Sequence, residues 1–208
     1  MKQSIFFNKT FAIFLTIVII ALSFALGGAR SLNGVRDKAV AVFESGDKSI
    51  GNNISNFVGG IVNFFTGDNE NKIESTDGIL ECVRNKADVS QTVIILAEKY
   101  IVSGDYDVVK LKNAALNVKG TKSPYKIFDF NLAMDEAVSV LSKKLENEEI
   151  TDIEKRNLEL AVSQMTGYRN VMSLDKYNKM ASDYNKKLEK IPANFIKAAR
   201  LVKELPVF

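Results

Sequence analysis

The chain has 208 residues, 46% of them hydrophobic and 25% charged, which is enough for one folded domain with a sizeable core besides a membrane segment. Two of its 28 basic residues, Lys2 and Lys9, precede the first apolar segment, so the rest of the chain carries 26 basic against 25 acidic residues. A net charge of +1 over that part argues against a nucleic-acid-binding protein. There is no histidine. Most acid–base catalysts, Ser and Cys triads and transition-metal sites need one, so we expect no catalytic site, metal or cofactor.

The first element is an uncharged apolar segment from Phe11 to Ala29. As a helix it would measure ~28 Å, close to the hydrocarbon thickness of a bilayer. A cleaved signal peptide is the alternative, with small residues at Ala25-Leu26-Gly27 or Gly27-Gly28-Ala29 as cleavage sites. The apolar run is long for a signal peptide, so we expect a retained single-pass anchor. Flanking positive charges, two before and three after the segment, set no orientation.

Composition divides the chain into three parts. Residues 1–45 form the anchor and its helical extension, residues 46–76 form an insert rich in Gly and Asn, and residues 77–208 form a helical domain. Within the insert, Ile50–Phe65 keeps a helical apolar spacing without charge. We expect it to pack on the domain; contact with the membrane and a mobile insert are the alternatives.

Helical periodicity continues through the rest of the chain, and no segment alternates with period two. The pattern predicts helices over residues 30–44, 77–101, 105–118, 125–146, 151–168 and 175–191. Thr151 and Glu154 read as a capping box. For residues 105–118 we expect the buried face to hold Val108, Val109, Lys112, Ala115 and Leu116. The fold class is therefore all-α, an antiparallel helical bundle preceded by one transmembrane helix.

Candidate chemical groups are few. We interpret Cys82, the sole cysteine, as a core residue. Asp105 with Asp107, and the group from Glu146 to Glu154, lack the spacing of a calcium loop and are expected to be solvated surface. Asp135-Glu136 could face the interior, but the Glu-x-x-His motif of a di-iron site is missing.

A repeat near the C-terminus is the most informative pattern. Tyr177-Asn178 recurs as Tyr184-Asn185, and seven residues are nearly two helical turns. The stripe Tyr177, Ala181, Tyr184, Leu188 and Ile191 predicts a helix buried on one face and ended by Pro192.

Asparagine is a poor helix former, so its use twice in register predicts a local role for the amide. We expect Asn178 and Asn185 to form hydrogen bonds to neighbouring helices, and Tyr177 and Tyr184 to fill the core with hydroxyls at its edge. Asn side chains that face outward and bind a partner are the alternative.

This C-terminal stretch, Asp175 to Phe208, resembles the signature of the LemA family of bacterial membrane-anchored helical proteins. The matching positions are Tyr177-Asn178, Tyr184-Asn185, Pro192-Ala193-Asn194 and the run Lys203 to Phe208, which includes Pro206. The resemblance implies an uncleaved anchor and a location in the bacterial cell membrane. It implies no known reaction, and the 46–76 insert departs from the family.

The C-terminal helices are basic. Between Lys176 and Lys203 there are eight Lys or Arg against Asp183 and Glu189, a net of +6. A solvated face is the first expectation, and contact with anionic lipid is the alternative.

Together these patterns predict a non-enzymatic scaffold or protein-interaction module, held in the lipid bilayer through residues 11–29. A ligand-binding protein secreted after cleavage, or a hydrolase that works without histidine, are the alternative functions.

Overall fold

The computed structural model describes residues 9–46, 78–190 and 193–208, and every regular element in these ranges is a helix. The expected all-α fold is therefore confirmed. Residues 47–77 lie outside the described ranges, so the prediction for the segment Ile50–Phe65 does too, together with Ile191 and Pro192.

The chain forms two compact units. One contains residues 1–38 and 182–205, and the other contains residues 39–181 and 206–208.

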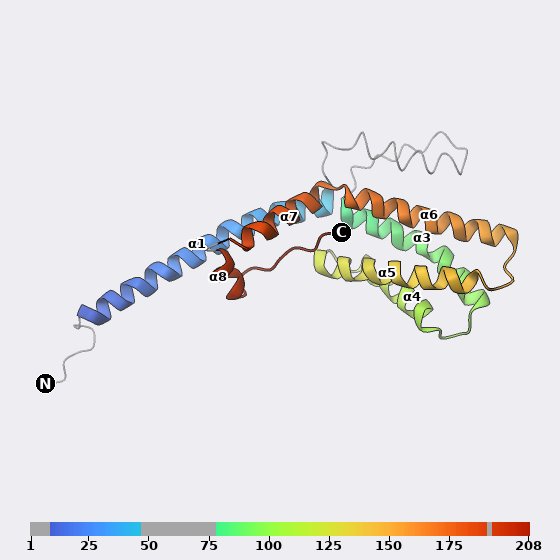
Figure 1. Cartoon of the computed structure of the whole chain (residues 1–208), viewed down its shortest axis with the longest axis horizontal. Helices are drawn as coiled ribbons and strands as arrows, with labels where there is room; N and C mark the ends of the chain where they lie inside the picture. Colours follow the sequence, from blue (N-terminus) through green and yellow to red (C-terminus); the bar gives the residue numbers. More distant parts are fainter. Residues whose placement is uncertain (1–8, 47–77, 191–192) are drawn as a thin grey trace. The chain divides into compact units, whose positions relative to one another are not determined.

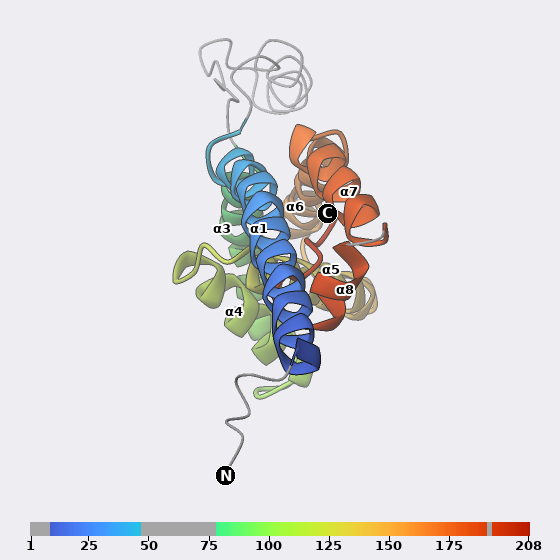
Figure 2. The same cartoon turned by 90° about the vertical axis from the view of Figure 1, so that its left-hand side faces the viewer.

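The first unit is built on the long helix α1 (Lys9–Ser45), which continues into the second unit after Lys38. The apolar segment and the expected extension over residues 30–44 thus form one uninterrupted helix. Gly46 ends it with a φ of 70°, a left-handed conformation that glycine adopts without strain, and donates its N–H to the carbonyl of Val42. Helix α8 (Ala193–Ala198) lies beside α1 in both views, and these two segments belong to the same unit (Figures 1 and 2).

The second unit is an antiparallel bundle of four helices (Figure 1). They are α3 (Ile79–Tyr100), α4 (Tyr106–Lys119), α5 (Pro124–Leu145) and α6 (Asp152–Ser173). Helix α3 contacts each of the other three, and α4 and α5 also pack against each other. Short connections force neighbours to run in opposite directions, which produces the bundle topology.

Local signals fix where these helices begin. Thr151 and Glu154 form the expected capping box at α6, and the Asp105 side chain accepts the N–H of Asp107 at α4. Pro124 opens α5, where its missing N–H costs no hydrogen bond. Helix α6 passes through Gly167 without a break and ends before Asp175, where α7 (Lys176–Leu188) begins.

The buried face of α4 differs from the predicted one. Val108 and Ala115 are buried, but Val109, Lys112 and Leu116 are exposed. The face that packs holds Val108, Leu111, Ala114, Ala115 and Val118. Both faces have helical spacing, and only the positions of α3 and α5 decide which one is covered.

Candidate functional site

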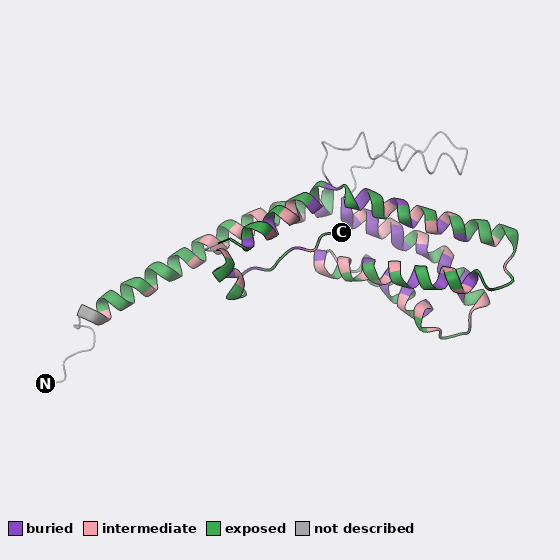
Figure 3. Ribbon diagram, viewed as in Figure 1, coloured by how far each residue is buried: buried purple, intermediate pink, exposed green. Residues whose placement is uncertain are grey.

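The N-terminal part of α1 is apolar on all sides, and no other described part of the chain buries its most apolar stretch. Figure 3 shows it as a continuous exposed stretch. The exposed large side chains are Ile13, Phe14, Leu15, Ile17, Ile19, Ile20, Leu22, Phe24 and Leu26. A helix that is hydrophobic on all sides is stable only when a protein core or the hydrocarbon layer of a membrane surrounds it. By length and composition, α1 is long and apolar enough to cross a membrane.

In the bundle unit, the Asn178 amide binds the end of the chain. Its Nδ2 donates to the Phe208 carbonyl at 2.7 Å, and its Oδ1 accepts the Phe208 N–H at 2.8 Å. A second hydrogen bond from Nδ2 reaches the Met172 carbonyl at 2.7 Å, near the C-terminus of α6. One buried side chain thus satisfies a helix-end carbonyl and both polar groups of an extended residue.

In the unit of α1, Asn185 makes the same pair of bonds to a different residue. Its Nδ2 donates to the Leu205 carbonyl, and its Oδ1 accepts the Leu205 N–H, both at 2.8 Å. Seven residues of α7 rise ~10.5 Å, and the three steps from residue 205 to residue 208 span ~10 Å when extended. The spacing of the two asparagines along α7 therefore matches the spacing of Leu205 and Phe208 along an extended segment.

These bonds correct one expectation from the sequence in part. Asn178 does reach a neighbouring helix, through the Met172 carbonyl of α6, but its other bonds go to the backbone of Phe208, and those of Asn185 go to the backbone of Leu205 rather than to a helix. Both amides are also engaged by their own chain rather than presented to a partner. Tyr177 and Tyr184 are fully buried with Ala181 and Leu188, as predicted.

The aromatic residues of the bundle unit gather around Phe208. Its ring centroid lies 5.6 Å from that of Phe43, 5.4 Å from that of Phe128 and 6.0 Å from that of Tyr177. We predicted that the Tyr177 hydroxyl would lie at the edge of the core. Its oxygen is instead buried and has no hydrogen-bond partner. Burial raises the pKa of this hydroxyl.

The other signature positions are less constrained. Asn194 is exposed in the first turn of α8. Pro206 is half-buried and lies in sequence between Leu205 and Phe208, the two residues that the asparagines bind. The structure thus brings Asn178 and Asn185 together with the C-terminal segment and leaves Asn194 apart from these hydrogen bonds.

A buried lysine in the bundle was missed by the sequence reasoning. Lys86 of α3 has no exposed surface, donates to Asn131 Oδ1 at 2.9 Å and forms an ion pair with Asp135. Arg169 of α6 reaches the same carboxylate at 3.1 Å. Burial lowers the pKa of Lys86, and the Asp135 carboxylate opposes that shift.

A signal for Lys86 was present in the sequence. It stands three residues after Val83 and four before Ser90, a spacing that places all three on one side of a helix. A lysine in such a stripe needs a buried partner, because an unpaired charge in the core is costly. Asp135, considered above for a metal site, is that partner.

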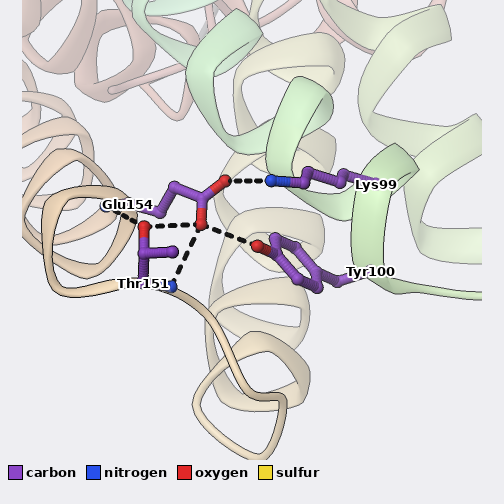
Figure 4. Close-up of polar contacts among 4 residues, drawn as sticks. All are labelled: Lys99, Tyr100, Thr151 and Glu154. Carbon is purple, nitrogen blue, oxygen red and sulfur yellow. Dashed lines mark hydrogen bonds and ion pairs between the residues drawn. The ribbon is translucent and has the colours of Figure 1, made fainter.

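Glu154 joins the ends of two helices (Figure 4). Its carboxylate accepts hydrogen bonds from Lys99 and Tyr100, at the C-terminus of α3, each at 2.7 Å. The Thr151 hydroxyl and N–H donate to it at 2.7 and 3.0 Å. These hydrogen bonds, led by that of Lys99, lower the pKa of Glu154 to about 2.

The expected solvated acidic surface is only partly correct. Glu146, Glu148, Glu149 and Asp152 are exposed, and a groove of about 840 Å³ runs beside them on α5 and α6. Asp105 and Asp107, however, are half-buried and bind the ammonium of Lys144 at 2.7 and 2.9 Å. In the described part of the chain, no three Cys, Asp or Glu side chains gather as metal ligands would.

Cys82 is buried in the bundle, as predicted. Comparison with known proteins gives no match, whether to a family model, to a curated protein or to a solved structure.

Proposed function

We propose that this protein is a bacterial single-pass membrane protein of the LemA type, whose bundle acts as a non-enzymatic scaffold or protein-interaction module at the membrane surface. The observation that carries the proposal is the apolar, exposed stretch of α1 from Phe11 to Leu26. In water that stretch would leave large hydrophobic side chains uncovered, whereas a bilayer would cover them.

A non-enzymatic role is supported by the state of the charged side chains. Lys86, Asp135, Lys144 and Glu154 are held in ion pairs that join one bundle helix to another. A side chain fixed in this way contributes to the position of helices and is poorly placed to exchange protons with a substrate.

Resemblance to the LemA signature supports the family and the bacterial location. The signature asparagines hold the chain's own end, and this gives the repeat a role in folding that needs no substrate.

Membrane extraction tests the proposal. The full chain should stay in the pellet when membranes are washed with alkaline carbonate, and a chain that begins at Arg30 should pass into the supernatant. A lysine at the centre of the span costs about 3 kcal/mol in insertion assays, so Ile17→Lys together with Ile20→Lys should also release the protein. As a matched control, Ile95→Lys places the same charge at another exposed apolar residue and should leave it in the pellet.

Two results would contradict the proposal. Full-length protein in the supernatant would show that α1 is not an anchor. Released protein whose mass lacks the N-terminal residues would instead favour the secreted, cleaved form.

A further inference from the structure

Helix α8 is docked on α1 at a glycine. Ile196 of α8 is buried, and a Cβ atom at Gly28 would lie 2.6 Å from its Cδ1 atom. Ile196 therefore occupies the space that a larger residue at position 28 would fill. Both residues belong to the same unit.

That contact sets the depth of α8 in a membrane. Gly28 is the last residue but one of the uncharged segment that begins at Phe11, and Arg30 follows. The rise from Phe11 to Gly28 is ~26 Å, close to the thickness of the hydrocarbon layer. If α1 spans the bilayer as proposed above, on which this inference rests, α8 lies at the level of the lipid headgroups.

The exposed residues of α8 suit that level. Phe195, 70% exposed, and Leu201, 47% exposed, lie on either side of the buried Ile196 in sequence. Aromatic and apolar side chains beside basic ones are typical of interfacial segments. At the same level of α1, a hollow of about 420 Å³ is lined by Leu26, Gly27, Ala29, Arg30 and Asn33. The buried Oδ1 atom of Asn33 accepts no hydrogen bond.

Arg200 is held in a conformation that favours glycine. Its φ is 58°, and among the residues that the structure describes no other non-glycine residue has a positive φ. Its N–H donates to the Lys197 carbonyl at 2.9 Å, and the Leu201 N–H donates to the Ile196 carbonyl at 3.2 Å, which is the Schellman arrangement at the end of a helix. Arginine is strained at this position and glycine is not. Strain retained in this way points to a use for the side chain.

We propose that residues 193–201 form a contact site for anionic lipid, in which Phe195 and Leu201 enter the interfacial layer and the Arg200 guanidinium binds headgroup phosphates. The planar guanidinium can donate two parallel hydrogen bonds to a phosphate, which a lysine cannot do. Nearby, Lys197 is paired with Glu204 and is less suited to this role.

A tryptophan reporter tests this site, because the chain has no tryptophan of its own. Phe195→Trp protein is reconstituted into vesicles of phosphatidylcholine alone or mixed with phosphatidylglycerol, and quenching by brominated acyl chains is measured. We expect quenching and a blue-shifted emission, both stronger with phosphatidylglycerol. Arg200→Gly should abolish the difference between the two vesicle types while leaving the thermal midpoint unchanged or raised, since glycine relaxes the backbone. Arg200→Lys should restore it only in part.

Lys190→Gln is the matched control, since it removes one charge from an exposed residue of the same unit outside α8. It should leave the quenching unchanged, and an equal loss would overturn the assignment to Arg200. Unquenched emission from protein that floats with the vesicles would overturn the lipid contact while the anchor stands. Failure to float would overturn the anchor itself.

Discussion

At the scale of residues, the two side-chain types of the Tyr-Asn repeat have different structural roles. The tyrosines supply apolar volume to the core, and each asparagine supplies a donor and an acceptor to one extended residue. An amide matches the N–H and C=O of a peptide unit, so a single side chain can replace the neighbour that an extended segment would have in a sheet. These hydrogen bonds account for the presence of a poor helix former at both positions.

We predict that Asn178→Ala and Asn185→Ala lower the thermal midpoint. Each substitution leaves backbone groups of the C-terminal segment without partners, at a cost of about 1–3 kcal/mol. Alanine favours a helix over asparagine by roughly 0.5 kcal/mol, so without these bonds the midpoint would rise. Melting in mild detergent, followed by circular dichroism, measures the effect.

Lys179→Ala is the control for this prediction, because Lys179 is exposed on the same helix. Its midpoint should stay within the small change typical of surface substitutions. Unchanged or raised midpoints in both asparagine variants would show that the hydrogen bonds contribute nothing to stability.

The pKa of Glu154 predicts a dependence of stability on acid pH. It is about 2 in the folded protein against 4.5 for the unperturbed group. A lowered carboxyl pKa contributes stability that is complete above about pH 4.5 and is lost as the pH falls toward 2. Urea midpoints of the parent and of Glu154→Gln should therefore differ most above pH 4.5 and converge near pH 2.

Glu159→Gln serves as the comparison, since Glu159 is exposed on the same helix and lies in no hydrogen bond or ion pair described above. Its urea midpoint should stay within the small change typical of surface substitutions. If the urea midpoints of the parent and of Glu154→Gln differ by the same amount from pH 5 to pH 2, the role given to the Lys99 and Tyr100 hydrogen bonds is contradicted.

At the scale of elements, the start of α3 depends on a close approach between backbones. Gly78 precedes α3, and a Cβ atom there would collide with the Phe43 carbonyl oxygen and lie 2.6 Å from the Gly46 nitrogen. Its φ of −65° is ordinary for any residue, so the requirement for glycine is one of space. Backbone atoms cannot move aside as the end of a side chain can.

We predict that Gly78→Ala destabilises the bundle by about 1–3 kcal/mol, the usual cost of forcing extra volume into a packed contact. Gly120→Ala is the matched control, because the nearest atom to a Cβ there is 3.7 Å away and its φ is −90°. That change should be neutral or slightly stabilising. Urea denaturation compares the two, and equal effects would contradict the steric account.

At the scale of the whole molecule, the last residues of the sequence are part of the core. Phe208 packs with Phe43, Phe128 and Tyr177, which come from three different helices. Phe208 is therefore part of the core of the bundle unit.

We predict that ending the chain at Lys203 lowers stability more than either asparagine substitution, because it removes the Phe208 ring as well as the clamped backbone. In the shortened chain Asn178→Ala should cost less than in the full chain, since one of the two partners of Asn178 is gone. Urea midpoints of the four proteins form the cycle. Equal costs in both chains would show that Asn178 and Phe208 are not coupled.

The sequence determined the features that depend on neighbours along the chain. Uninterrupted apolar residues gave α1, three-and-four spacing gave the other helices, and Thr151 with Glu154 gave the start of α6. The burial of Tyr177 and Tyr184 followed from the same periodicity. These signals are local, because helical hydrogen bonds and caps join residues at most a few positions apart.

Only the tertiary structure decided which groups meet across the chain. Asn178 could be assigned a polar role, but its partner Phe208 lies 30 positions away. Lys86 likewise donates a hydrogen bond to Asn131, 45 positions away, besides its ion pair with Asp135. The covered face of α4 was likewise open between two apolar faces until its neighbours were in place. Periodicity shows that a face can be buried, whereas the choice of partner depends on how helices distant in sequence pack in space.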